Sequence, residues 1–104
     1  MFNPNKRYIT TNCSSTIGID LQIMLFGLID ERLAQKAEVD YLQIFELSVD
    51  VVNGKKLQVV VHRQEQPEYK QRIVLLHIEE PIDGEKIWVI DSGDYCTMLL
   101  PSDY

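Results

Sequence analysis

Residues 62 to 72 are the part of this chain whose side chains are best suited to chemistry or recognition. The segment reads His-Arg-Gln-Glu-Gln-Pro-Glu-Tyr-Lys-Gln-Arg and lies between two strongly apolar stretches. A tight turn needs only residues such as Gly, Asn, Asp or Pro, so this run carries more hydrogen-bonding groups than a turn requires. We therefore predict that it contacts a partner, through His62, Arg63, Glu65, Tyr69, Lys70 and Arg72.

Two kinds of partner fit these residues. Arginine and tyrosine are frequent anchors of protein interfaces, so the leading hypothesis is a non-catalytic protein-interaction module. The alternative is an RNA or single-stranded nucleic-acid binder, in which Tyr69 stacks on a base while Lys70 and Arg72 contact phosphates. The interleaved Glu65 and Glu68 cancel part of that positive charge. A third interpretation is that the segment is only a solvated connection between strands.

Catalysis and metal binding find less support in the residue spacing. The chain contains two histidines and two cysteines, without Cys-x-x-Cys or His-x-x-x-His spacing. It also lacks the glycine motifs that cradle phosphates, so we predict neither a metal nor a cofactor. A small enzyme built around His62 and Glu46 is kept as a minor hypothesis. Cys13 and Cys96 are predicted to be reduced side chains that pack in the core.

The charge distribution limits the possible partners further. The net charge is −6, and residues 79–104 contain seven acidic residues against one basic residue, Lys86. Such an acidic surface repels a phosphate backbone, so duplex DNA is not an expected partner. We expect this surface to contribute to the contact with a protein partner.

The length of 104 residues suits a single domain over residues 1–104. No stretch approaches the roughly 18 apolar residues that cross a membrane. Lys6 and Arg7 are not followed by an apolar run, so the first residues do not resemble a secretory signal. A cytoplasmic protein without membrane contact is therefore expected.

One long helix is predicted over residues 18–36, after a short strand at residues 6–11. Its apolar residues recur at helical spacing and form one core-facing stripe, made of Leu21, Leu25, Leu28, Ile29 and Leu33. The hydroxyls of residues 14–16 are predicted to cap its start. Ile23 and Met24 fall outside the stripe, which leaves open whether they pack between neighbouring elements or contact a partner.

From residue 41 onward the pattern changes to the alternation of β-strands. Strands are predicted at residues 41–51, 57–64, 71–78, 86–91 and 95–100. Short connections between them favour an antiparallel meander. The predicted fold is therefore α+β, in the order β-α-β-β-β-β-β, with one helix packed on the sheet.

The hairpin at Asn53-Gly54 decides which side chains share a face of the sheet. A two-residue loop would mix apolar and polar side chains on one face. A three-residue loop, Val52 to Gly54, pairs Phe45 with Val61 and keeps one face apolar. We therefore predict the three-residue loop. In this register His62 lies on the polar face and is exposed to solvent, so we expect the polar segment to serve recognition and not folding.

The last strands are apolar toward both faces of the sheet, although one helix covers only one face. The sequence is compatible with two ways of covering the second face of the sheet. The sheet curls into a partial barrel, or a second copy of the chain packs against it to form a homodimer. For the second arrangement, the candidate self-association residues are Trp88, Ile90 and Met98.

Four blocks of sequence resemble a known family. The blocks cover residues 40–47, 62–69, 87–91 and 95–101, and Tyr104 follows them. They are similar to domain of unknown function 960, a family of small proteins from low-GC Gram-positive bacteria and their mobile elements. The resemblance runs over essentially the whole chain. It implies a stand-alone cytoplasmic protein of bacterial origin, and it implies no activity and no catalytic residues.

Overall fold

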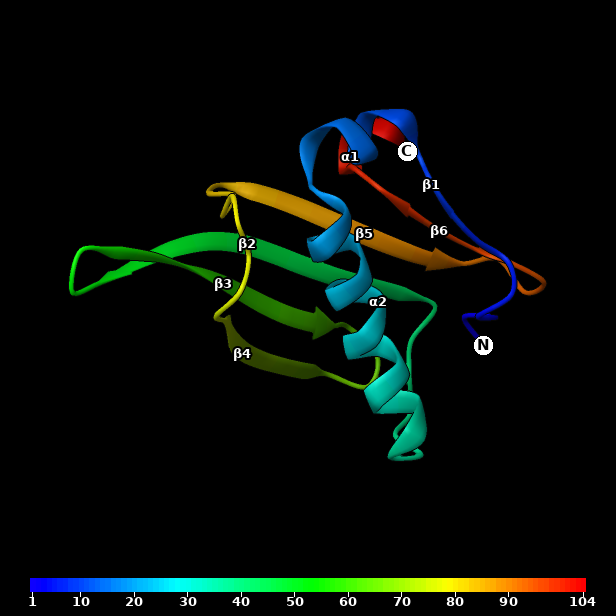
Figure 1. Ribbon diagram of the computed structural model, residues 1–104. Helices are drawn as coiled ribbons and strands as arrows, with labels where there is room; N and C mark the ends of the chain where they lie inside the picture. Colours follow the sequence, from blue (N-terminus) through cyan, green and yellow to red (C-terminus); the bar gives the residue numbers. More distant parts are fainter.

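The structure, a computed structural model that describes residues 1–104, is an α+β fold in which one long helix packs on a six-stranded mixed sheet (Figure 1). This confirms the predicted fold class. The elements in chain order are β1 (Arg7–Ile9), α1 (Thr11–Thr16), α2 (Ile19–Ala34), β2 (Leu42–Val52), β3 (Lys55–Gln64), β4 (Tyr69–Leu75), β5 (Glu85–Asp91), β6 (Cys96–Leu99) and the 3₁₀ turn η1 (Pro101–Asp103).

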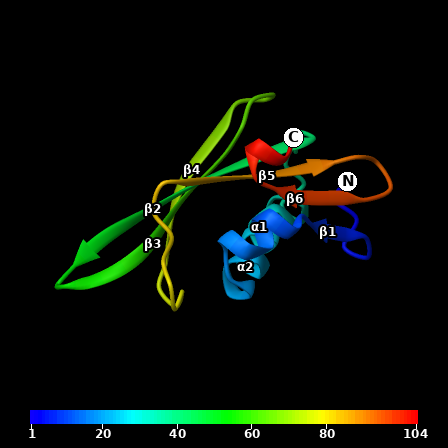
Figure 2. The same cartoon turned by 90° about the horizontal axis from the view of Figure 1, so that it is seen from above.

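The strand order is β1-β6-β5-β2-β3-β4. β2, β3 and β4 pair with one another in chain order and antiparallel, as in a meander, and β5 and β6 pair in the same way. The chain departs from a simple meander after β4, because residues 76–84 cross back over the sheet so that β5 pairs with β2. β1 pairs with β6 in parallel. The sheet is not closed into a barrel, and β1 and β4 are its edges (Figure 2).

Helix α2 lies where the apolar stripe predicts it, with Leu21, Leu25 and Ile29 fully buried against the sheet. The predicted capping by residues 14–16 is wrong. Those residues belong to α1, whose N-cap is Thr10, and α2 follows Gly18 without a side-chain cap. The extended backbone of residues 17 and 18 separates the two helices, so the hydroxyls of α1 lie one element too early to cap α2.

The register of the β2–β3 hairpin differs from the prediction by one residue. Val52 pairs with Lys55, so the loop contains only Asn53 and Gly54, both with positive φ. Positive φ at both positions is the type I′ geometry that matches the twist of the flanking strands and that Asn-Gly sequences favour. Phe45 consequently pairs with His62 and not with Val61. A one-residue change turns every β3 side chain to the other face, which brings His62 under the helix.

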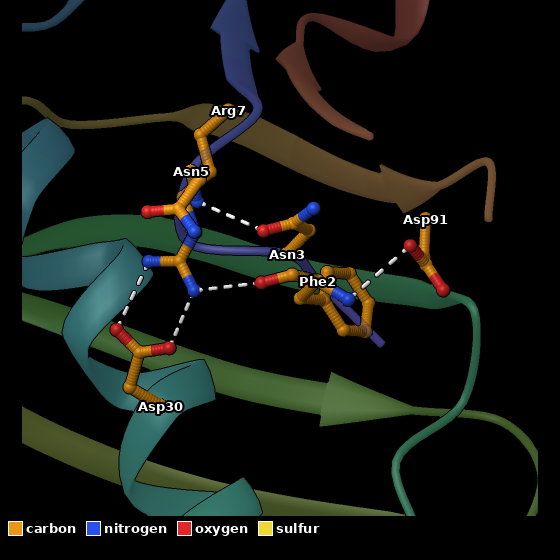
Figure 3. A network of polar contacts seen from close by, with 6 residues as sticks. All are labelled: Phe2, Asn3, Asn5, Arg7, Asp30 and Asp91. Atoms are coloured by element: carbon orange, nitrogen blue, oxygen red, sulfur yellow. Dashed lines mark hydrogen bonds and ion pairs between the residues drawn. The ribbon is translucent and has the colours of Figure 1, made fainter. Parts of the chain in front are cut away.

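Two polar anchors hold the crossover and the N-terminal segment onto the helix-facing side of the sheet. Gln58 on β3 donates to the carbonyl of Ile82 at 2.9 Å and accepts from its N–H at 2.7 Å, which fastens the crossover. At the β1 edge of the sheet, Arg7 forms a bidentate ion pair with Asp30 of α2 and donates to the carbonyl of Phe2 (Figure 3). Phe2 is buried, and its N–H donates to Asp91.

Candidate functional site

The polar segment of residues 62–72 is not one surface. β3 continues to Gln64 and β4 begins at Tyr69, so only residues 65–68 form a connection, which includes a cis peptide before Pro67. Successive side chains of a strand point to opposite faces. His62 and Tyr69 therefore lie under helix α2, where their rings contact each other edge to face.

The side chains of Arg63, Lys70 and Arg72 lie on the opposite face of the sheet. Arg63 approaches Glu46 at 3.5 Å, and Arg72 approaches Asp50 at 3.1 Å. Glu65 is exposed in the connection itself. The six residues proposed as one contact site are thus divided between two faces and a turn.

His62 was expected to be exposed, and this expectation is wrong. Only 1% of the residue is accessible to solvent. The ring stacks on Phe45 at 4.4 Å between centroids, and the Nε2 nitrogen lies 2.7 Å from the side-chain oxygen of Gln43. The hypothesis of an enzyme built on His62 and Glu46 fails for the same reason. Glu46 follows Phe45 on β2 and points to the opposite face.

A chain of buried amides fixes the orientation of the His62 ring. Gln43 uses its amide nitrogen to donate to the backbone carbonyl of Asp40 and to the side-chain oxygen of Gln64. Its side-chain oxygen is then the acceptor at the imidazole, so His62 donates from Nε2–H and carries its lone pair on Nδ1. No hydrogen bond of the chain uses that second nitrogen.

Gln64 extends this polar chain to the nearby backbone. Its amide nitrogen donates to the carbonyls of Glu38 and Pro67, and its oxygen accepts from the N–H of Asp40. The two buried glutamines therefore tie the α2–β2 connection and the β3–β4 turn to the sheet. Neither glutamine stands out in the sequence as a buried residue.

Arg32 covers the other side of this polar cluster. Its guanidinium carbon lies 3.5 Å from the centre of the Tyr69 ring. The Nε atom is buried without a hydrogen-bond partner, and no ion pair or hydrogen bond of the structure uses the Arg32 side chain. Burial and, to a smaller extent, the positive charge of Arg32 together lower the pKa of His62 from 6.5 to about 4. The imidazole is therefore neutral at pH 7.

A cavity of about 210 Å³ lies between α2 and the strands at this point. His62, Tyr69, Gln71 and Ile73 line it from β3 and β4. Leu28, Glu31 and Arg32 of the second half of α2 and the C-cap residue Gln35 close it. The Tyr69 hydroxyl donates to the side-chain oxygen of Gln71. The cavity thus combines an unpaired cation, a neutral imidazole and amide groups.

A second hollow, of about 460 Å³, lies along the first half of α2 and is mainly apolar. Ile23 and Met24 line it from the helix, with exposed fractions of 63% and 42%, and Leu76 lines it from the end of β4 with 58%. Because β4 is an edge strand, no other strand covers this side of the sheet. The two residues that fell outside the helix stripe thus face solvent beside a free sheet edge.

The nucleic-acid hypothesis loses its structural basis in this arrangement. Tyr69 has one ring face covered by Arg32 and lies on the helix side of the sheet. Lys70 and Arg72 lie on the other side, where Arg72 is paired with Asp50. A single strand of nucleic acid cannot stack on Tyr69 and contact both cations from one side of β4.

The acidic residues of the last quarter do not form one surface either. Asp103 accepts hydrogen bonds from the side chains of Thr10 and Asn12 at the start of α1, and it accepts from the N–H of Leu100. These hydrogen bonds lower the pKa of the Asp103 carboxyl. Asp91 binds the N-terminal segment, whereas Glu79 and Glu80 lie beside the start of α2. Much of the acidic excess therefore serves local structure.

The candidate self-association residues also lie on different faces. Met98 is fully buried under the helix and cannot reach a second copy from the native surface. Trp88 and Ile90 are half-buried on the face that no helix covers. Tyr104 contacts the Trp88 ring edge to face, and the indole N–H of Trp88 is buried without a partner. Whether two copies associate there stays a prediction.

The remaining reactive groups are buried or dispersed. Cys13 and Cys96 are free and buried, and burial raises the pKa of the Cys13 thiol to about 11 and that of Cys96 in the same direction. No group of three or more His, Cys, Asp or Glu side chains could hold a metal ion. None of the helices is both long enough and apolar enough to cross a membrane.

A family model described as a Staphylococcal protein of unknown function (DUF960) matches residues 6–103. The chain belongs to this family. The match confirms the resemblance seen in the sequence. A solved structure described as a protein of unknown function from Enterococcus faecalis has the same fold, with a TM-score of 0.77 and 25% identity over 95% of this chain and 90% of that chain. No curated protein matches the chain.

Proposed function

We propose that this DUF960 protein is a non-catalytic interaction module that binds an extended segment of a partner protein along the α2–β4 groove, defined by Ile23, Met24, Val74, Leu75, Leu76 and Ile78. The main support for this proposal is that the apolar groove runs beside the free edge of β4. An exposed edge strand with apolar pockets alongside is the arrangement that accepts an added strand from a partner.

The backbone of β4 supports this mode of binding. Residues 69–75 bond to β3 on one side, and no other segment of the chain bonds to their outer side. A partner strand would complete these hydrogen bonds. Its alternate side chains would point toward α2, where Ile23 and Met24 offer apolar contact.

The charges around β4 indicate the kind of segment that fits. On the face away from α2, Lys70 has no ion pair and Arg72 is more than half exposed, so an acidic side chain fits between the apolar positions of the partner. Past Leu76, the groove ends near Asp20 and Glu79, where a lysine or arginine fits. Three of the six residues predicted from the sequence (Tyr69, Lys70 and Arg72) belong to β4, the strand whose free edge the partner segment would join.

Gly27 gives further support. It lies in the middle of α2, on the flank shared with Ile23 and Met24, where glycine costs about 1 kcal/mol relative to alanine. A Cβ atom placed at Gly27 would meet nothing within 4 Å, so packing inside the chain does not require glycine there. The space suits the close approach of a partner chain.

The partner is proposed to be a cytoplasmic protein, in keeping with two free cysteines. The test uses synthetic peptides with alternating apolar and acidic residues and a basic end, and follows binding by fluorescence anisotropy. Wild type should bind a subset saturably, and a Met24→Asp, Leu76→Lys double variant should lose this binding. The matched control is Val51→Lys, which alters an exposed apolar residue near the tip of the distant hairpin.

Three outcomes would contradict the proposal. No peptide binds, or the double variant binds as well as wild type, or Val51→Lys weakens binding equally. Sedimentation equilibrium adds a further check. A wild-type dimer that the double variant converts to monomer would show that a second copy, and not a partner segment, occupies the groove.

A further inference from the structure

A second site is present beneath the other half of α2, separate from the groove that the proposed function uses. We propose that the cavity at Arg32 and His62 binds a small monocarboxylate that carries a hydroxyl or amino hydrogen, such as a short hydroxy acid. The first support is that Arg32 is a cation without an anion. No carboxylate of the chain pairs with it, and its Nε atom is shielded from water without a partner.

The position of Arg32 is fixed by its stacking on Tyr69, with 3.5 Å between the guanidinium carbon and the ring centre. A planar guanidinium whose N–H groups are unused presents a fork that matches the two oxygens of a carboxylate. Stacking through the face leaves the edge of the guanidinium available for these in-plane hydrogen bonds.

His62 supplies the complementary acceptor. Its Nε2–H is committed to Gln43, and its Nδ1 lone pair has no partner in the chain. Tyr69 contacts both groups, Arg32 over its ring face and His62 through a perpendicular ring contact at 5.5 Å between centroids, so the cation and the acceptor lie within reach of one small molecule. A hydroxyl or amino hydrogen beside the carboxylate would donate to Nδ1.

The surroundings exclude larger or more highly charged anions. The volume of about 210 Å³ is below the range of ordinary drug-sized sites. Arg32 is the only cation that lines the cavity, and the Glu31 carboxylate at the same site disfavours a dianion such as phosphate. The other polar groups, Gln35 and Gln71, add amide hydrogens without charge.

The experiment uses the whole protein and follows the ring resonances of His62 and Tyr69 by NMR. Sodium glycolate is added at constant ionic strength, with sodium acetate, sodium phosphate and sodium chloride as separate arms. Glycolate should give saturable shifts at both rings, with weaker binding of acetate, which lacks the hydroxyl.

Arg32→Gln should abolish these shifts, and Arg72→Gln, which removes an exposed arginine of β4, should keep them. The glycolate, acetate and chloride arms are compared in wild type alone, so they test the site even if Arg32→Gln does not fold. The proposal is overturned if glycolate gives no saturable shift, if chloride gives the same response, or if folded Arg32→Gln binds as wild type does.

Discussion

His62 stacks on Phe45, its directly paired neighbour across β2 and β3, with 4.4 Å between the ring centroids and 20° between the ring planes. The imidazole thus occupies a place in the core that an aromatic hydrocarbon could fill. Its single internal hydrogen bond, to Gln43, satisfies the one N–H of the neutral ring. Protonation would add a second N–H and a positive charge beside Arg32, so the folded state favours the neutral form.

The first prediction is therefore a loss of stability in mild acid. The pKa of His62 is about 4 in the folded protein and ordinarily 6.5, so the unfolded state binds more protons between these values. The free energy of unfolding should fall as the pH falls from about 6.5 to about 4, by up to ~3 kcal/mol, and level off below that as far as His62 is concerned. Urea unfolding across this pH range measures it.

Two variants separate this effect from the titration of carboxylates. His62→Gln should be less stable than wild type near pH 7 but should lose less stability on acidification. His77→Gln, which changes the exposed histidine, should follow the wild-type profile. If His62→Gln and wild type lose stability in parallel, the imidazole is not the group responsible.

The second prediction concerns the buried amides. Gln64→Ala should lower the free energy of unfolding by about 2–4 kcal/mol, because it removes the partners of Gln43 and of the backbone at Glu38, Asp40 and Pro67. Chemical denaturation measures the change. The control is Gln66→Ala in the adjacent turn, an exposed residue whose side chain makes no hydrogen bond, and it should change stability by less than about 0.5 kcal/mol. Equal effects of the two substitutions would argue against a stabilising role for the hydrogen bonds of Gln64.

The third prediction is that Gly27→Ala stabilises the protein by roughly 0.5–1 kcal/mol while weakening binding in the groove. Alanine is the better helix former, and its Cβ meets nothing inside the chain. Thermal unfolding and the peptide titration report the two effects separately. A destabilised variant would mean that the helix already needs the glycine, and unchanged peptide affinity would place the partner elsewhere.

The fourth prediction is that both thiols react only when the structure opens. Cys13 and Cys96 are fully buried, and burial raises the pKa of each thiol, so little thiolate is available in the folded state. Labelling with a disulfide reagent should be slow in native buffer and should accelerate in urea in proportion to the unfolded fraction. Rapid labelling of either cysteine in native buffer would contradict its burial.

The sequence was sufficient for the helix and most strands because their periodicity is strong. Leu21, Leu25 and Ile29 mark the buried side of α2 without ambiguity. The β2–β3 register could not be obtained from the same argument, which assumed that an apolar face contains no polar residue. In the structure Gln43, Gln58, His62 and Gln64 share the face of Phe45, where hydrogen bonds satisfy the three amides and the Nε2–H of His62. The Asn53-Gly54 turn preference alone pointed to the correct two-residue loop.

The candidate sites were harder to predict because they depend on elements distant in sequence. An arginine in the last turn of a helix is usual, since it complements the helix dipole, so Arg32 gives no signal by itself. Its contact with Tyr69 arises only after β4 has reached the sheet edge below α2. Ile23 and Met24 were the exception, because their departure from the helix stripe was visible in the sequence.

The parallel pairing of β1 with β6 has a consequence for synthesis on the ribosome. Arg7 lies opposite Cys96, so the first strand to be made has its only sheet partner in the last one. At roughly 5–20 residues per second, β1 waits several seconds for β6. During this time α2 and the β2–β3–β4 meander can form from local contacts, while Phe2 lacks the strands that bury it. β1 is therefore expected to pair with β6 only after β6 has been translated, as the final step of folding.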